Sequence, residues 1–191
     1  MPLLTGLDLI RRVRAGPKQI PVILTSGAMP WHEADLLAIR AVLKRDFHPR
    51  GGATLARLEP DAVQQACNLN GNAPPEPLAR ALQAEQLAAI RFPTGSLIGD
   101  WKRGQRIAQS GRGLQWNDRP KDPAGGSCYN CHQLSPQEAS YGTLGPSLLG
   151  FGRQRGNSPE IQKYAYGRIY NAKAYNLCSQ MPRLGHSGTL S

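Results

Sequence analysis

The segment 126–132 reads Gly-Ser-Cys-Tyr-Asn-Cys-His, and no other stretch of this 191-residue chain limits its possible folds as strongly. Two thiols three positions apart lie on one face of a helical turn. Cys128 and Cys131 can each add to a vinyl group at the edge of a haem, with His132 beneath the iron as an axial ligand. Because Cys-x-x-Cys-His is the attachment signature of c-type haem, the sequence predicts one covalent haem c.

Two other uses of this cysteine pair stay open. A thioredoxin-like dithiol would follow a strand in a βαβ unit, whereas a polar loop rich in Pro and Gly precedes Cys128. A zinc site needs a second ligand pair at suitable spacing, and Cys178 and His186 are isolated from each other in the sequence. The context favours haem, with a redox dithiol and zinc as the alternatives.

A haem that carries electrons needs a sixth ligand, so that little rearranges when the electron moves. Of the three methionines, Met181 lies in a loop with Pro182 and polar neighbours. This setting favours ligation of the iron over the core packing that is the alternative for a lone methionine. His186 is the second candidate for the same position.

Further residues are predicted to support the haem. The turn at 145–148 is predicted to place the Pro146 carbonyl against the outer nitrogen of His132, with an ordinary surface turn as the alternative. In an oxidising compartment Cys67 and Cys178 are expected to form a disulfide, with two free thiols as the alternative. Three arginines are candidates to neutralise the propionates, with solvent exposure as the alternative: Arg153, Arg155 and Arg183.

Composition excludes some functions. The net charge of +10 is spread along the chain, and there is no basic run or aromatic ladder for nucleic acid. No apolar run is long enough to span a membrane. The N-terminus lacks the regions of a secretory signal, although haem c implies a periplasmic location. With 21 Gly and 16 Pro, we expect short helices, many turns and a small core.

The first fifty residues predict alternating helix and strand: a helix over Leu7–Arg14, a strand over Ile20–Leu24 and a helix over Glu33–Val42. This part resembles the second half of a response-regulator receiver domain. The residues that carry the resemblance are Met1-Pro2, Gly6-Leu7-Asp8-Leu9, Ile20-Pro21-Val22-Ile23, Ser26-Gly27, Phe47 and Pro49. The phospho-accepting aspartate would lie upstream of Met1, so we expect no phosphotransfer from this partial α/β segment.

Residues 51–91 are predicted to be a linker and a helical extension, and residues 92–191 a cytochrome c domain. Short helices are expected near Asp61–Cys67 and over Glu76–Arg91. Asp100 is predicted to cap a helix that turns Trp101, Gly104, Ile107 and Ala108 inward. Ser158-Pro159-Glu160 predicts the start of a helix that ends near Tyr170.

Residues 67–190 resemble SoxX, a family of small monohaem cytochrome subunits of the thiosulfate-oxidising SoxAX complex. The resemblance rests on six ordered motifs: Gly99-Asp100-Trp101-Lys102-Arg103-Gly104, Ile107-Ala108-Gln109-Ser110-Gly111-Arg112-Gly113, Cys128–His132 with Gln133-Leu134, Gly142-Thr143-Leu144-Gly145-Pro146-Ser147-Leu148, Ile169-Tyr170-Asn171-Ala172, and Cys178-Ser179-Gln180-Met181-Pro182-Arg183-Leu184-Gly185-His186.

The resemblance implies a mainly α, class I cytochrome c fold with His132 and Met181 as axial ligands. It implies a periplasmic heterodimer with a SoxA-like cytochrome subunit. That pair acts as an L-cysteine S-thiosulfotransferase, which joins thiosulfate oxidatively to a cysteine of the SoxYZ carrier protein. The catalytic haem lies in SoxA, so this chain would have no catalytic residue and would pass electrons to a downstream cytochrome acceptor.

The chain differs from the family in lacking a final helix after Ser191, which would pack across the helix near Asp100. We therefore expect Trp101 and Ile107 to lose a partner surface, at about 1.5–3 kcal/mol for each large apolar contact. Two other functions stay open: an unrelated periplasmic electron-transfer cytochrome c, and a cytoplasmic signalling fragment built on the receiver-like part.

Overall fold

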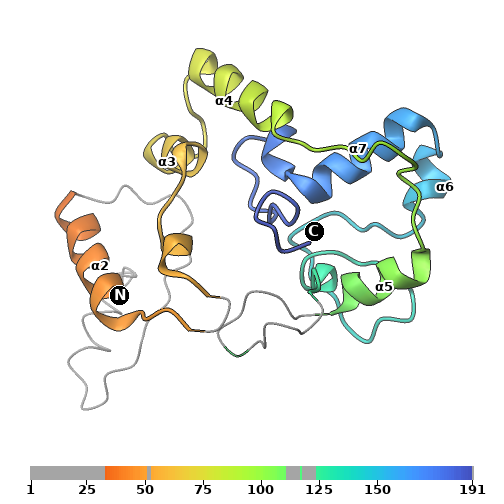
Figure 1. Ribbon diagram of the computed structural model, residues 1–191, viewed down its shortest axis with the longest axis horizontal. Coiled ribbons are helices and arrows are strands. Elements are labelled where there is room, and N and C mark those ends of the chain that lie inside the picture. The colour runs from red at the N-terminus through yellow and green to blue at the C-terminus, as the bar shows by residue number, and fades with distance from the viewer. Residues whose placement is uncertain (1–32, 51–52, 111–116, 118–123, 191) are drawn as a thin grey trace, which may run out of the picture. The chain divides into compact units, whose positions relative to one another are not determined.

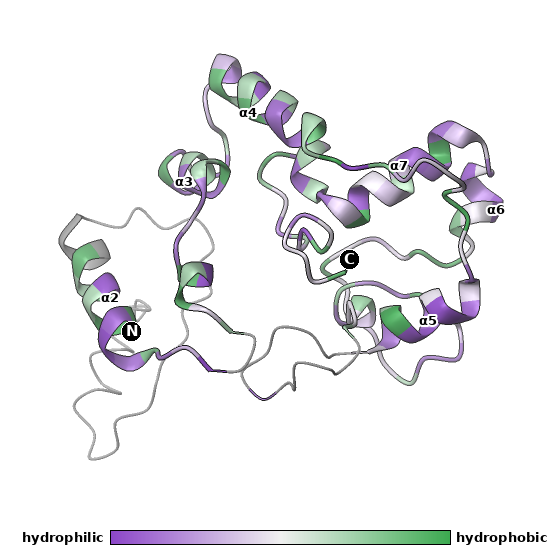
Figure 2. Ribbon diagram, in the orientation of Figure 1, coloured by the Kyte–Doolittle hydropathy of each residue, from purple (hydrophilic) through white to green (hydrophobic). Residues whose placement is uncertain are grey.

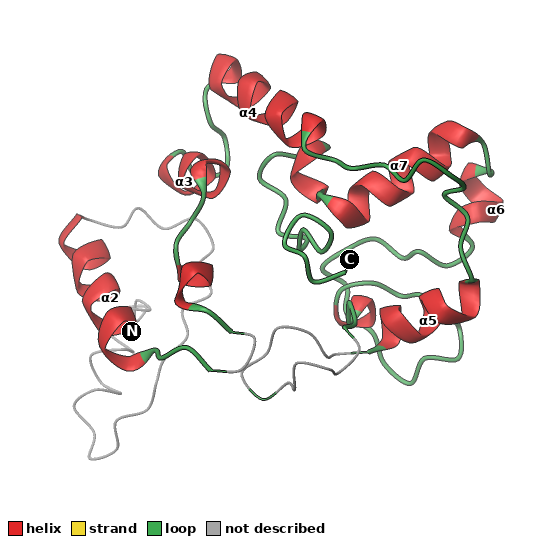
Figure 3. Cartoon of the chain, in the orientation of Figure 1, coloured by secondary structure: helices red, strands yellow, loops and turns green. Residues whose placement is uncertain are grey.

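The computed structural model describes residues 33–50, 53–110, 117 and 124–190, and these are mainly helical (Figure 1). Loops join the helices, as Figure 3 shows. Within the described ranges there is no β-strand, and β pairing is limited to an isolated antiparallel bridge between Arg50 and Ala53. The elements are α2 (Glu33–Asp46), the 3-10 turn η1 (Leu55–Leu58), α3 (Ala62–Leu69), α4 (Glu76–Ala88), α5 (Trp101–Gln109), the 3-10 turn η2 (Cys128–Asn130), α6 (Phe151–Arg155), α7 (Pro159–Tyr170) and the 3-10 turn η3 (Ala172–Ala174). The prediction of a mainly α chain is confirmed.

The chain divides into two compact units between Phe47 and His48. In the first unit the structure describes α2, so the helix predicted to begin at Glu33 is present and extends to Asp46. The predicted helix at 7–14 and strand at 20–24 lie outside the described residues. The receiver-like resemblance therefore stays a prediction.

In the second unit α3 begins with a reciprocal cap. The Asp61 carboxylate accepts a hydrogen bond from the Gln64 backbone N–H at 2.8 Å, and the Gln64 side chain accepts one from the Asp61 N–H at 3.0 Å. This capping box satisfies two backbone donors that a helix start otherwise leaves unpaired. It fixes where the helix begins and turns Val63, Ala66 and Cys67 into the core.

The main apolar cluster joins the two ends of this unit. Five buried residues form it: Val63, Ala66, Cys67, Leu82 and Leu177. Leu177 is more than ninety positions after Leu82 in the sequence, so the cluster ties α3 and α4 to the loop after η3. Full burial of a side chain such as Leu82 contributes about 1.5–3 kcal/mol, which makes this helical extension part of the core.

The turn η3 is the most deeply buried segment of this unit. Ala172 and Ala174 are almost completely buried, and so are the neighbouring Asn171 and the Lys173 side chain. Asn171 and Ala172 belong to a motif of the SoxX resemblance, and their burial gives that motif a packing role. Small alanine side chains allow the backbone of η3 to approach α4 closely, since the two elements are in contact.

The helix α5 begins as predicted, because the Asp100 carboxylate accepts hydrogen bonds from the backbone N–H groups of Lys102 and Arg103. Its packing differs from the prediction. Ile107 is half-buried, but Gly104 is exposed and the Trp101 side chain is 71% exposed. The prediction that both face inward was wrong, and the exposure of Trp101 agrees instead with the expectation that its partner surface is missing. Figure 2 shows the mixture of polar and apolar residues along this helix.

The second predicted cap is also present. The Ser158 hydroxyl accepts a hydrogen bond from the Ile161 backbone N–H, and Pro159 occupies the first turn of α7. The helix ends at Tyr170, as expected. Of the helices in the described part of the chain, none has both the length and the apolar character needed to cross a membrane.

Candidate haem attachment site

The Cys128–His132 segment forms a tight turn. Ser127 precedes it with a φ of 45°, and the single turn η2 follows. The Cys128 carbonyl accepts hydrogen bonds from the backbone N–H of Cys131 at 3.1 Å and of His132 at 2.9 Å. Both cysteines are free thiols of intermediate burial. The turn thus holds both thiols and the histidine in one short, hydrogen-bonded piece of backbone.

A second set of hydrogen bonds fastens this turn to α5. The Gly126 N–H donates to the Ile107 carbonyl, and the Ser127 N–H donates to the Ser110 carbonyl, each at 2.8 Å. The Ser127 hydroxyl donates to the same Ser110 carbonyl at 3.1 Å. The end of α5 therefore positions the cysteine turn.

The surroundings of Cys128 act on its thiol. Burial raises the pKa of the Cys128 thiol, and the neighbouring Cys131 raises it further. Redox-active and metal-binding cysteines have a pKa below the usual value, in electropositive surroundings. This observation favours the thiol form of Cys128 and gives no support to the redox-dithiol alternative.

His132 is oriented by the loop that follows it. Its Nδ1 lies 2.7 Å from the Pro146 carbonyl oxygen, which is the contact that the sequence predicted. A carbonyl can only accept, so Nδ1 is the donor in this contact, and Nε2 is the ring nitrogen left to bind a metal. A carbonyl on the outer nitrogen is the usual partner of a metal-binding histidine, because it fixes the ring and raises its basicity.

The same loop lies so close to the turn that two of its positions require glycine. The Gly145 N–H donates to the Cys131 carbonyl and the Gly142 N–H to the Tyr129 carbonyl, each at 2.8 Å. A Cβ at Gly145 would overlap the His132 ring, and one at Gly142 would overlap the backbone at Asn130. The motif residues around Pro146 thus form a close backbone layer against the histidine.

Met181 lies in a second loop and is half-buried, with its N–H donating to the Ser179 hydroxyl at 3.2 Å. It lines a cavity of about 560 Å³ that Gly126, Ser127 and Asn130 also line. The structure therefore brings the methionine loop and the cysteine turn to one cavity. Cys128, Cys131 and His132 themselves are not in its wall.

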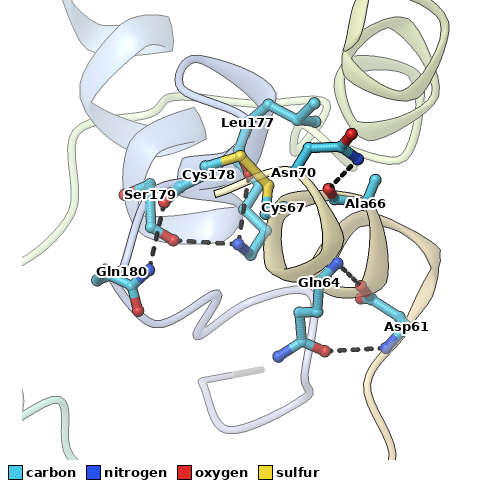
Figure 4. Close-up of a disulfide and its surroundings, with 10 residues drawn as sticks. Asp61, Gln64, Ala66, Cys67, Asn70, Leu177, Cys178, Ser179 and Gln180 are labelled. Atoms are coloured by element: carbon cyan, nitrogen blue, oxygen red, sulfur yellow. Dashed lines mark hydrogen bonds between the residues drawn. A yellow bond between two sulfur atoms is a disulfide. The ribbon is translucent and has the colours of Figure 1, made fainter. Parts of the chain in front are cut away.

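The predicted disulfide is present between Cys67 of α3 and Cys178, with Cα atoms 5.6 Å apart and a sequence separation of 111 (Figure 4). Cys178 precedes Met181 by three positions. The bond joins the helical extension to the loop that contains the methionine.

The cavity wall is basic. Lys173, Arg183 and His186 all line it. Burial lowers the pKa of Lys173, and the positive charge of Arg183 lowers it further. Burial and then Arg183 also lower the pKa of His186. The site thus favours the neutral form of this second candidate ligand.

Sequence reasoning missed the side chains that hold the methionine loop. The Lys173 ammonium donates to the carbonyls of Leu177 at 3.3 Å and Ser179 at 3.1 Å. Arg183 pairs with Asp61, so this predicted propionate partner already has a carboxylate. The other two predicted partners, Arg153 and Arg155, are exposed on α6. No local feature of the sequence marks Lys173 as a buried cation.

Comparison with known proteins adds one relative. No family model matches the chain. A protein of Aquifex aeolicus (strain VF5), which bears the name uncharacterized lipoprotein, is 34% identical over 134 residues. The match takes in 69% of this chain and 63% of that protein, so the chain spans less than two thirds of the relative's length.

Proposed function

We propose that the chain is a c-type cytochrome with one haem bound covalently through Cys128 and Cys131, His132 and Met181 being the axial ligands. The observation that carries this proposal is the bond between His132 Nδ1 and the Pro146 carbonyl at 2.7 Å. It leaves Nε2 as the ring nitrogen available to the iron and orients the ring. When bound, haem supplies a one-electron couple at its iron.

Exposed apolar side chains support the fit of a porphyrin. Four lie in the loop that contains Pro146, and each is large and exposed: Tyr141, Leu144, Leu148 and Leu149. A flat apolar group is what such side chains would cover. The glycines of this loop keep its backbone against His132, while a thioether at Met181 favours the reduced state. In this proposal α5, η2 and α7 belong to a class I cytochrome c fold.

We infer a location outside the cytoplasm. Haem c attachment and the disulfide between Cys67 and Cys178 both belong to an oxidising compartment. The similarity to a protein named as a lipoprotein agrees with this location. The periplasm is the compartment that the SoxX resemblance implies.

The more specific role follows from that resemblance alone. The chain would be the electron-transfer subunit beside a SoxA-like subunit, in the enzyme that conjugates thiosulfate to a cysteine of the SoxYZ carrier. The haem held by His132 and Met181 would receive electrons from the SoxA-like subunit and pass them to a downstream cytochrome. A co-purification with a SoxA-like partner tests this part of the proposal.

The haem itself is tested by producing the full chain, with an export leader, in a bacterium that has the cytochrome c maturation system. A denaturing gel stained for peroxidase activity should show a stained band at the mass of the chain. The Cys128→Ala/Cys131→Ala variant should lose the stain, because neither thioether can form.

The matched control is Cys67→Ala/Cys178→Ala, which also removes two cysteines but leaves the attachment turn intact. We expect it to keep its stain per amount of chain. A colourless wild-type chain in which Cys128 and Cys131 react as free thiols would refute the haem proposal.

A further inference from the structure

The loop that contains Met181 is held on both sides by the helices α3 and α4. We propose that these helices are a clamp that positions the Met181 sulfur on the iron, with Lys173 as its central positioning residue. This inference rests on the proposed function, since it concerns the same ligand. We use the word clamp for the contacts of Asp61, Cys67, Gln83 and Gln86 with the segment 171–183, together with the hydrogen bonds of Lys173 inside that segment.

The first side of the clamp holds the loop before Met181. The disulfide fastens Cys178 to Cys67, which is 3% exposed in the core. The Lys173 ammonium donates to the carbonyl oxygens of the residues on either side of Cys178, namely Leu177 and Ser179. The disulfide fixes one residue and the ammonium fixes its two neighbours, so the backbone at 177–179 has little freedom.

Lys173 is itself fixed by α4. The Gln83 side chain donates to the Ala174 carbonyl at 3.1 Å, and the Asn171 side chain donates to the Gln86 side-chain oxygen at 3.0 Å. Lys173 lies between these two contacts and is 8% exposed. Burial of a cation with so little exposure to solvent costs free energy unless its N–H donors form hydrogen bonds. The two carbonyls of the methionine loop accept hydrogen bonds from two of the three N–H donors of Lys173, which ties the loop to η3.

The second side of the clamp holds the loop after Met181. Arg183 pairs with Asp61 at the start of α3, and it also donates to the Gln86 side-chain oxygen at 3.3 Å. Gln86 therefore accepts from Asn171 and from Arg183, and it joins the two sides. Met181 lies three positions after Cys178 and two before Arg183.

A ligand loop fastened on both sides places its sulfur in one position before any bond to the metal forms. Ordering the loop then costs little entropy on ligation, which is the general advantage of preorganisation. The chain beyond a single anchor would have many conformations available. The clamp thus predicts that the bond between sulfur and iron depends on contacts remote from the haem.

The test uses the red charge-transfer band that ferric haem shows with a methionine sulfur ligand, measured on the exported full chain. Met181→Ala defines complete loss of the band. Lys173→Leu should lose the band and lower the midpoint potential while keeping the haem stain, because leucine cannot donate to either carbonyl. Lys163→Leu, at an exposed position of α7, is the matched control and should keep both.

Asp61→Asn gives a second test of the clamp, and this test does not depend on whether the Lys173 variant folds. Asparagine can still cap α3 but has no charge for Arg183, so we expect a weaker band and a lower potential. If both variants are stained and keep the wild-type band, the clamp is wrong and the haem proposal stands. A stained wild type without the band also overturns the clamp, and an unstained wild type overturns both proposals.

Discussion

Removal of the disulfide between Cys67 and Cys178 is expected to lower the free energy of unfolding by several kcal/mol. The bond spans a sequence separation of 111. The chain-entropy expression for a cross-link of that length gives about 4.8 kcal/mol at 25 °C, and loss of a native disulfide from a small domain typically costs about 2–5 kcal/mol. Since small domains have about 5–15 kcal/mol in total, this bond accounts for a large share of the stability.

The perturbation is Cys67→Ala/Cys178→Ala. Alanine is preferred to serine because Cys67 is buried in the core, where an unpaired hydroxyl would add its own cost. Urea unfolding followed by far-UV circular dichroism gives the free energy of unfolding from the midpoint and the slope. A dithiol reductant added to the wild type should reproduce the loss, and it should leave the variant unchanged.

The reasoning fails if both treatments lower the free energy of unfolding by less than about 1 kcal/mol at an unchanged slope, far below the loop-closure value. Such a result would mean that the core cluster and the Arg183–Asp61 pair hold the methionine loop to α3 without the disulfide. The unfolded chain would then be as restricted without the bond as with it.

Two further outcomes follow from the contacts around the site. Gly145→Ala should destabilise the chain by about 1–3 kcal/mol and displace His132, because the added Cβ would overlap the His132 ring. Gly152→Ala in α6 is the control and should do neither, because there is open space around that position. Unfolding curves measure the change in stability, and the haem spectrum measures the displacement of His132. Burial alone would raise the pKa of Asp61, but the hydrogen bond from a backbone N–H and the charge of Arg183 hold it below its ordinary value. The ionised Asp61 carboxylate therefore stabilises the folded chain above its ordinary pKa, and this stabilisation is lost as the pH falls below about 4. The difference in free energy of unfolding between wild type and Asp61→Asn should shrink in that acidic range. A difference that stays constant with pH would show that the charge is irrelevant.

The helix starts were predictable because they depend on residues close in sequence. Asp100 and Ser158 each accept a hydrogen bond from a backbone N–H two or three positions later, and such caps need no tertiary contact. The contact between His132 and Pro146 was predictable for a similar reason, since only fourteen positions separate them. The 3-10 turn that begins at Cys128 was predictable for the same reason, because its hydrogen bonds join residues close in sequence.

The burial of α5 was not predictable from its pattern. An amphipathic helix indicates which side is apolar, but it does not indicate whether another element covers that side. Trp101 lies on the apolar side and is exposed, although Ile107 on the same helix is half-buried. The amphipathic spacing predicted the helix correctly, but it did not predict which of the residues of α5 are buried.

By itself the sequence determined the mainly helical character, two capped helix starts and the short turn that holds two thiols and a histidine together. Those features depend on hydrogen bonds and spacings within a few residues. Only the tertiary structure decided that Lys173 is buried against the methionine loop and that Arg183 pairs with Asp61, 122 positions away. Such contacts join segments far apart along the chain, and their partners are selected by the packing of α3 and α4, which no local pattern encodes.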